Sequence, residues 1–322
     1  MKTMQLFKLC LLFCILMSIA ANVFSQNVPR GRSNDSPVLL VAMGRLYLAW
    51  SDKDNKRLQI TSSLDGINWA PKVELRETSD KAPSLAYFNE RFYLAWRGND
   101  KKNHLNIISS PDGGRTWIDK ITFRDGNIVA RTIERPAILS AGGKLNLMWN
   151  NREDRHIDWI SSVDGMNWNF PISRVYNPLS VLMSSVSYIN NAIVSCPKFI
   201  DFTSDPMISY TRFLYFSESD RRWVEFSRLD NVASISLIET KGRLYAVISL
   251  YGHVGFFLYS SSLSPIDWRE EFYFNETSSY VPALAFYNNQ FFVAWTGTDK
   301  DRRLNVMSSH DGFNWGNKIT FR

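Results

Sequence analysis

The stretch Ser109–Trp117, which reads SSPDGGRTW, has near-copies elsewhere in the chain. They are SSLDGINW, ending at Trp69, SSVDGMNW, ending at Trp168, and SSHDGFNW, ending at Trp315. An aspartate in such a stretch accepts backbone N–H bonds within a tight turn, and the glycine allows a positive φ. The tryptophan supplies a large apolar surface that packs between strands. The repetition therefore predicts a scaffold built from one unit used several times.

Each turn belongs to a longer repeat. Four copies are clear, at residues 36–75, 82–123, 135–173 and 281–321. Two eroded copies fit between them and end at Trp223 and Trp268, so that successive repeat tryptophans are 48, 51, 55, 45 and 47 residues apart. A period of this length with several short strands per period is typical of a propeller.

The strands within a copy are visible as alternating apolar and polar residues rich in β-branched and aromatic side chains. We predict an all-β fold, a six-bladed β-propeller with four-stranded antiparallel blades in a single domain, residues 26–322. Seven blades are the alternative. We expect the ring to close by packing of the first blade on the sixth, and exchange of a strand between them is the alternative.

The repeated turn resembles the Asp-box, also known as the bacterial neuraminidase repeat. The copy at Ser110–Trp117 matches the form S-x-D-x-G-x-T-W, and the other three copies are one residue shorter. In Asp-box propellers this turn joins the third and fourth strands of a blade, away from the ligand-binding face. The resemblance thus implies a structural role for four aspartates: Asp65, Asp112, Asp164 and Asp311.

The loops after the second predicted strand of each clear copy also share a pattern. Each begins with a tryptophan, has an acid four positions later, and continues with basic side chains. Indole faces and charged groups together suit a sugar, so we predict a ligand-binding role for eight residues: Trp50, Asp54, Trp96, Asp100, Trp149, Glu153, Trp295 and Asp299. The alternative is that the tryptophans pack between blades and the charges form a solvated rim.

The resemblance implies two classes of function, since Asp-box propellers include sialidases and are similar to multivalent propeller lectins. Sialidases bind the substrate carboxylate with three arginines, but Arg30, Arg32 and Arg135 do not reproduce the family's sequence context. The same holds for the candidates in the later copies: Arg212, Arg243, Arg269, Glu239, Glu270 and Glu271. We therefore assign no catalytic set and predict a lectin-like, non-catalytic carbohydrate-binding protein. A sialidase-like glycosidase, or a propeller lyase using Tyr251 and His253, is the alternative.

The first 25 residues are predicted to be a secretory signal. Lys2 and Lys8 precede the apolar run Leu9–Ala21, and small residues follow it. We expect cleavage after Ser25 and a secreted or periplasmic location. A membrane anchor is the alternative, but the run is shorter than the roughly 20 apolar residues that cross a bilayer.

Composition limits the partners. The formal charge of +6 is too small an excess to indicate nucleic acid. The four histidines lack a metal-ligand spacing and no glycine-rich phosphate loop occurs, so we expect neither a metal nor a cofactor. Cys196 is the one cysteine beyond the predicted signal, and no intrachain disulfide is expected. The expected partner is a glycan or polysaccharide.

Overall fold

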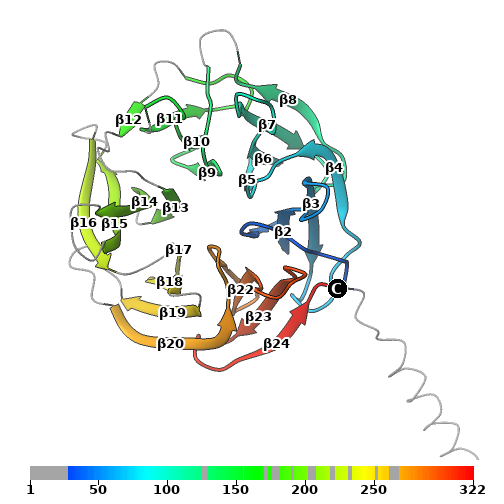
Figure 1. The fold of residues 1–322 in the computed structure, drawn as a ribbon, viewed down its shortest axis with the longest axis vertical. Coiled ribbons are helices and arrows are strands. Elements are labelled where there is room, and N and C mark those ends of the chain that lie inside the picture. Colours follow the sequence, from blue (N-terminus) through cyan, green and yellow to red (C-terminus); the bar gives the residue numbers. More distant parts are fainter. Residues whose placement is uncertain are drawn as a thin grey trace, which may run out of the picture.

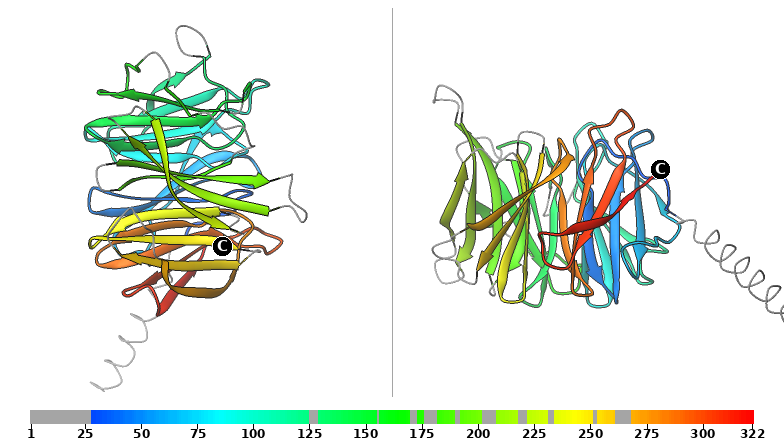
Figure 2. Two further views of the ribbon diagram at one scale, coloured as in Figure 1. Left: turned by 90° about the vertical axis from the view of Figure 1, so that its left-hand side faces the viewer. Right: turned by 90° about the horizontal axis from the view of Figure 1, so that it is seen from below.

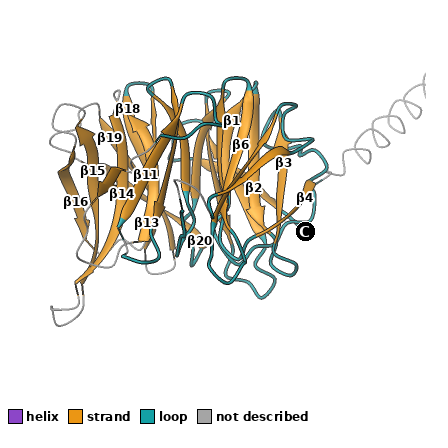
Figure 3. Cartoon of the chain, turned by 90° about the horizontal axis from the view of Figure 1, so that it is seen from above, coloured by secondary structure: helices purple, strands orange, loops and turns teal. Residues whose placement is uncertain are grey.

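The computed structural model describes residues 28–124, 129–154, 156–169, 173–175, 182–189, 192–201, 208–217, 222–230, 234–250, 253–260 and 268–322. In these ranges the chain forms 24 strands and no helix, arranged as six four-stranded antiparallel sheets. The sheets stand around a central axis as the blades of a propeller (Figure 1). Figure 3 shows the same body from the side, built of strands and loops. The predicted all-β, six-bladed fold is confirmed.

Each blade is formed by four consecutive strands. Blade one contains β1 (Val38–Ala42), β2 (Arg45–Ser51), β3 (Arg57–Ser63) and β4 (Val73–Thr78). Blade two contains β5 (Ser84–Phe88), β6 (Arg91–Arg97), β7 (Leu105–Ser110) and β8 (Ile118–Thr122). Blade three contains β9 (Ala137–Ala141), β10 (Lys144–Asn150), β11 (Ile157–Ser162) and β12 (Ser173–Val175). Blade four contains β13 (Leu182–Ile189), β14 (Ala192–Asp201), β15 (Ile208–Ser217) and β16 (Arg222–Asp230). Blade five contains β17 (Ser234–Thr240), β18 (Arg243–Leu250), β19 (His253–Ser260) and β20 (Trp268–Thr277). Blade six contains β21 (Ala283–Tyr287), β22 (Gln290–Thr296), β23 (Leu304–Ser309) and β24 (Trp315–Thr320).

The first strand of every blade lies at the centre of the ring and lines a channel (Figure 1). Because antiparallel neighbours run in opposite directions, the connections alternate between two faces of the body (Figure 2). One face, the link face, carries the loops between second and third strands and the links from blade to blade. The other, the turn face, carries the turns between first and second strands and those between third and fourth strands.

The hydrophobic core is divided among the boundaries between blades. Six clusters are formed by the described residues, and each one joins two neighbouring blades. Second strands such as β2 and β6 are buried along almost their whole length because a neighbouring blade covers each of their faces. This continuous burial is why those strands read as near-unbroken apolar runs.

The ring closes through the segment at residues 28–37, which lies between blades six and one. The Leu304 N–H donates to the Gly31 carbonyl at 3.0 Å, and the Ser33 N–H donates to the Arg302 carbonyl at 3.0 Å. The innermost strands β1 and β21 are in contact. All four strands of blade six follow one another in the chain, so the blades close by packing and no strand is exchanged.

Candidate functional site

The four repeated turns, here called the Asp turns (residues 63–69, 110–117, 162–168 and 309–315), join third and fourth strands on the turn face. In blade one, Asp65 accepts hydrogen bonds from the N–H groups of Ile67 and Asn68 at 2.8 and 2.7 Å. The indole of Trp69 donates to the Gly66 carbonyl at 3.1 Å. Each of the other three aspartates accepts an equivalent pair of backbone bonds.

These contacts hold the aspartates in the ionised form. Burial raises the pKa of Asp65, but hydrogen bonds from Asn68, Ile67 and Ser63 outweigh it and bring the pKa to about 2. Hydrogen bonds within the turn likewise lower the pKa of the equivalent residues: Asp112, where they outweigh burial to give about 2, Asp164 and Asp311. A carboxylate whose oxygens serve its own turn has a scaffolding task, which supports the structural role that the resemblance implies.

The four loop tryptophans lie in the inter-blade clusters. Trp50, Trp96, Trp149 and Trp295 are 0–2% exposed, and their second strands continue one residue beyond them. Trp50 meets the ring of Phe321 of blade six at 6.2 Å between centroids, and it thus packs across a blade boundary. With no open face, these indoles have no surface for a pyranose to stack on. Their ligand-binding role stays a prediction, and their burial does not support it. The contact of Trp50 with Phe321 instead supports packing between blades.

The loop acids fall into two arrangements. In blades two and six, the acid caps its own loop: Asp100 accepts the N–H groups of Lys102 and His104 at 3.0 and 3.1 Å. Asp299 accepts the two corresponding N–H groups of its loop. A glycine precedes each acid by two positions, because a Cβ at Gly98 would lie 2.7 Å from the Asp100 carboxylate.

In blades one and three, the loop is one residue shorter and a different side chain caps it. Asp52 accepts the Asp54 N–H at 3.0 Å, and Asn151 accepts the Glu153 N–H at 2.8 Å. The acid four positions after the tryptophan does not cap the loop and instead pairs with an arginine of the link that leads into the same blade. Asp54 forms an ion pair with Arg32, and Glu153 forms one with Arg131 at 2.5 Å. All four predicted acids are thus engaged by the chain itself.

The links to blades one, two, three and six share a turn that our sequence analysis missed. Each has Ser or Thr four residues before a proline: Ser33, Ser79, Thr132 and Ser278. These four side chains are 0% exposed. Each serine hydroxyl accepts the N–H group two residues on at 3.1 Å, and the Thr132 hydroxyl donates to the Glu134 carbonyl at 2.8 Å. The signal S/T-x-x-x-P was legible in the sequence as a second repeat.

This turn sets one side chain per blade at the place where the chain enters the inner strand. The position carries Asp35 in blade one, Lys81 in blade two, Glu134 in blade three and Tyr280 in blade six. Lys81 forms an ion pair of 2.7 Å with Glu134, between two successive links. The repeated turn therefore carries different, mostly charged side chains on the link face.

Asp35 and Arg135 complete this charged group. The Asp35 carboxylate accepts the N–H of Ser36 at 2.6 Å and that of Ala82 at 3.0 Å, so it joins blade one to blade two. Arg135 lines the central channel. Burial lowers the pKa of Arg135, and the nearby Asp35 and Glu134 carboxylates oppose that shift. Since a guanidinium keeps its charge in proteins, a cation stands at this end of the channel. We call Asp35, Lys81, Glu134 and Arg135 the channel mouth.

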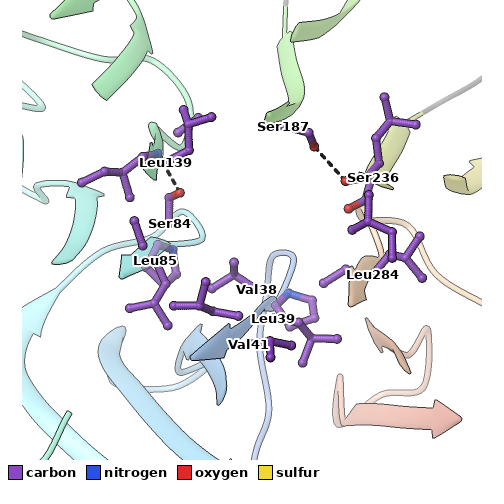
Figure 4. A pocket seen from close by; sticks show the side chains of 18 of the residues that line it. Val38, Leu39, Val41, Ser84, Leu85, Leu139, Ser187, Ser236 and Leu284 are labelled. Carbon is purple, nitrogen blue, oxygen red and sulfur yellow. Dashed lines mark hydrogen bonds between the residues drawn. The ribbon is translucent and has the colours of Figure 1, made fainter. Parts of the chain in front are cut away.

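The channel below the mouth is mainly apolar and has a volume of about 400 Å³. Figure 4 shows Val38, Leu85 and Leu284 among the side chains that line it. Two of its serines form hydrogen bonds within the wall: Ser84 accepts the Ile138 N–H at 3.0 Å, and Ser187 donates to the Leu237 carbonyl at 2.7 Å. The charged chemistry of the channel is therefore concentrated at its mouth.

The remaining sequence candidates are dispersed. Arg212 forms an ion pair of 3.2 Å with Glu225 in the sheet of blade four. Glu239 and Arg243 flank the turn between β17 and β18, on the turn face and away from the mouth. His253 is exposed at the start of β19. Tyr251 lies outside the described residues, as do the side chains of Arg269, Glu270 and Glu271.

Two general features complete the description. Among the described residues, no three His, Cys, Asp or Glu side chains are grouped as ligands of a metal ion would be. Within the same ranges, the chain has no helix with the length and hydropathy needed to cross a membrane.

No protein-family model and no curated protein matches the chain. Solved structures do resemble it in fold. A Penicillium chrysogenum α-L-arabinanase complexed with arabinobiose is 16% identical, with a TM-score of 0.65 over 88% of this chain and 94% of that chain. Trypanosoma rangeli sialidase in complex with sialic acid is 12% identical, with a TM-score of 0.61 over 88% of this chain and 55% of that chain.

A third similar structure is the SapL1 lectin in complex with α-methyl fucoside. It is 9% identical, with a TM-score of 0.61 over 91% of this chain and 95% of that chain. At these identities the likeness establishes the propeller fold and not the activity.

Proposed function

We propose that this protein is an exported Asp-box propeller that binds a glycan at its channel mouth without cleaving it. The observation that carries the proposal is the gathering of Asp35, Lys81, Glu134 and Arg135 from three successive links at one end of an apolar channel. Ligand sites in proteins commonly combine an apolar recess with a few fixed polar groups. Proteins of similar fold have been solved with arabinobiose, sialic acid and a fucoside, which favours a sugar as the ligand.

The burial of the loop tryptophans moves the proposed contact away from the repeated loops. A lectin with one site per blade needs equivalent exposed groups in each blade, and the four equivalent indoles are in the core. The mouth is different in every blade that contributes to it. We therefore propose one asymmetric site on the axis, not a set of identical sites.

The contacts of the two mouth carboxylates favour binding over catalysis. Glycoside hydrolysis uses one carboxyl group as acid and a second as nucleophile or base. The Asp35 carboxylate accepts two backbone N–H groups, and Glu134 is paired with Lys81. Both carboxylates are thus already engaged in contacts within the protein, which suits binding better than proton transfer.

Hydrolysis is the second candidate, and the presence of Arg135 between two carboxylates favours it. A guanidinium binds the carboxylate of an acidic sugar through paired hydrogen bonds. Asp35 and Glu134 act electrostatically on Arg135, so a sugar bound there would meet both acids. Turnover separates the two candidates: release of reducing sugar or of sialic acid from a bound glycan would replace the lectin proposal with the hydrolase.

A glycan array followed by titration of the hits tests the proposal. We expect Arg135→Gln to weaken binding at least about tenfold and Arg135→Lys to weaken it less, since charged hydrogen bonds contribute roughly 1.5–3 kcal/mol. Lys101→Met, on an exposed loop of the link face, is the matched control and should bind as the unaltered protein does. Binding that Arg135→Gln leaves unchanged would place the glycan elsewhere.

Export is a separate part of the proposal and rests on the sequence of residues 1–25. Amino-terminal sequencing of protein recovered from outside the cytoplasm should begin at Gln26. A first residue of Met1 in all the recovered protein would contradict it.

A further inference from the structure

The boundary between blades one and two contains a groove on the turn face. Its volume is about 450 Å³, within the usual range for small-molecule sites. Its walls come from β2, β3 and the start of β4 in blade one, and from the Asp turn of blade two. The lining includes Arg45, Tyr47, Thr61, Pro71, Gly113 and Arg115.

One extra residue in the Asp turn of blade two accompanies this groove. Where the other turns have one glycine, this turn has Gly113 and Gly114. At the boundary of blades two and three, the shorter turn packs so closely that a Cβ at Gly165 would lie 2.2 Å from the Tyr93 hydroxyl oxygen. At blades six and one, a Cβ at Gly66 would lie 2.0 Å from the Phe292 ring. The longer turn of blade two lies farther from the second strand of blade one. A Cβ at Gly113 would lie 3.3 Å from the nearest atom, the Tyr47 hydroxyl oxygen.

Because the turn is farther away, the hydroxyl of Tyr47 has no hydrogen-bond partner among the described residues. The equivalent hydroxyl, that of Tyr93, donates to the Asp164 carbonyl at 3.2 Å. Tyr47 is only 3% exposed, yet no described residue forms a hydrogen bond with its hydroxyl, which faces the groove. A hydroxyl that faces a groove can donate its hydrogen bond to a ligand or to water.

Two arginines beside this hydroxyl also lack partners among the described residues. In blade two, Arg91 donates to Ser109 at 2.8 Å and forms an ion pair with Asp119. In blade one, Pro71 stands where blade two has Asp119, and the corresponding Arg45 has no acid to bind. Arg115 replaces the apolar residue of the other Asp turns, and its exposed guanidinium has no partner in the described structure.

The acid that lines the groove does not satisfy these donors. Asp112 lines the groove, but its carboxylate accepts the N–H groups of Arg115 and Thr116 at 3.0 and 2.8 Å and the hydroxyls of Ser110 and Thr116 at 2.9 and 2.7 Å. The lone pairs of Asp112 are thus directed into its own turn. The groove offers two guanidinium groups and a phenol as donors, and this combination favours an anion.

We propose that the groove between blades one and two is a binding site for an oxyanion carried by a sugar, a carboxylate or a sulfate group, which Arg45, Arg115 and the Tyr47 hydroxyl bind. The site lies on the face opposite the channel mouth and does not depend on the function proposed for the mouth. Carboxylate and sulfate share the same acceptor chemistry, and the experiment distinguishes them.

Isothermal titration calorimetry at low ionic strength tests the site with two matched pairs of probes. Trigalacturonate is compared with its neutral methyl ester, and N-acetylglucosamine 6-sulfate with N-acetylglucosamine. We expect at least one charged probe to bind about tenfold or more tightly than its neutral twin, and to bind more weakly as salt is added. Equal binding of charged and neutral probes, or no binding of either charged probe, overturns the proposal.

Substitutions locate the binding. Arg45→Gln with Arg115→Gln should abolish the preference for the charged probe, and Tyr47→Phe should weaken binding by a few fold. The fold accepts phenylalanine at this position, since blade six carries Phe292 there. Arg76→Gln, an exposed arginine outside the groove, is the matched control and should change nothing. Retained binding in the double variant overturns the assignment.

Deletion of Gly114 is the sharpest variant, because it gives blade two the turn length of the other blades. We expect the shortened turn to close on Tyr47, so that its hydroxyl finds a carbonyl and the charged probe no longer binds, with thermal stability retained. Arg135→Gln, which alters only the mouth, should leave groove binding intact. A stable deletion variant that binds the charged probe as before contradicts the proposal.

Discussion

The Tyr93 hydroxyl donates a hydrogen bond of 3.2 Å to the carbonyl oxygen of Asp164, and so joins the second strand of blade two to the Asp turn of blade three. The contact is possible because Gly165 has no side chain and adopts a φ of 77°. A tyrosine and a glycine that are 72 residues apart thus depend on one another.

Gly165→Ala should destabilise the protein by about 2–5 kcal/mol, because a left-handed backbone strain of about 1–2 kcal/mol adds to a clash with Tyr93. Gly114→Ala is the matched control, since its φ is also positive but its Cβ would meet nothing closer than 3.4 Å. That variant should lose only the strain, about 1–2 kcal/mol. Urea unfolding measures the free energy of unfolding of both variants. Equal losses in the two variants would show that the Tyr93 contact does not contribute to stability.

Stability should fall in acid between about pH 4 and pH 2. The pKa values of Asp65 and Asp112 are about 2 in the folded protein, below the value of about 4 for an unfolded aspartate. A lowered folded-state pKa gives stability that is complete above the unfolded value and is lost as the pH falls toward the folded one. Urea midpoints measured from pH 7 to pH 2 should follow this course.

Asp112→Asn provides the control for the acid transition. The variant keeps an acceptor oxygen but has no charge to titrate, so it should be less stable at pH 7 and should lose less on acidification. An unchanged slope between about pH 4 and pH 2 in this variant would mean that the turn does not contribute to the pH dependence.

The two arrangements of loop acids should respond differently to salt. Asp299→Ala removes hydrogen bonds within a loop and should cost about 1–2 kcal/mol at any ionic strength. Glu153→Ala removes a surface ion pair with Arg131 and should cost at most about 1 kcal/mol, less in high salt. Thermal unfolding at low and high sodium chloride distinguishes the two, and the same salt response in both variants would contradict the assignment.

Trp96→Ala should destabilise the protein by about 3–5 kcal/mol, because the indole is 1% exposed between blades one and two. Trp96→Phe keeps most of the packing and should remain folded. If the tryptophan only packs, the folded Trp96→Phe variant will bind glycan as the unaltered protein does. A loss of binding without a loss of stability would restore the ligand-binding role predicted from the sequence.

The fold was predictable because one unit is repeated and four copies are well preserved. The spacing of Trp69, Trp117 and Trp168 gave the blade length, and the alternation within a copy gave its strands. Even the eroded fourth and fifth copies form four-stranded sheets. The blade architecture depends on local turn chemistry and periodicity, which a single sequence contains.

The candidate site was harder to predict because it depends on contacts between blades. Trp50 stands before a polar loop in the sequence, but its strand continues to Ser51 and blade six covers the indole. Of the mouth residues, only Arg135 was considered, and it was not assigned a role. The others were missed because they differ from blade to blade, although the buried Ser33 and Ser79 that position them recur. The groove accompanies one inserted glycine in blade two, which removes a contact that Tyr47 of blade one would otherwise form.

The links that lead into blades one and three are built alike, although one of them joins the far ends of the chain. Gly31 and Ala130 each accept an N–H bond at 2.9–3.0 Å from the strand of the preceding blade, at Leu304 and Leu105. The joint between blades six and one is therefore held by the same backbone contact as the joint between blades two and three. A circular permutant, with its old termini spliced and new ones opened in the Asn89–Glu90 hairpin, should keep the same six sheets and a comparable melting temperature.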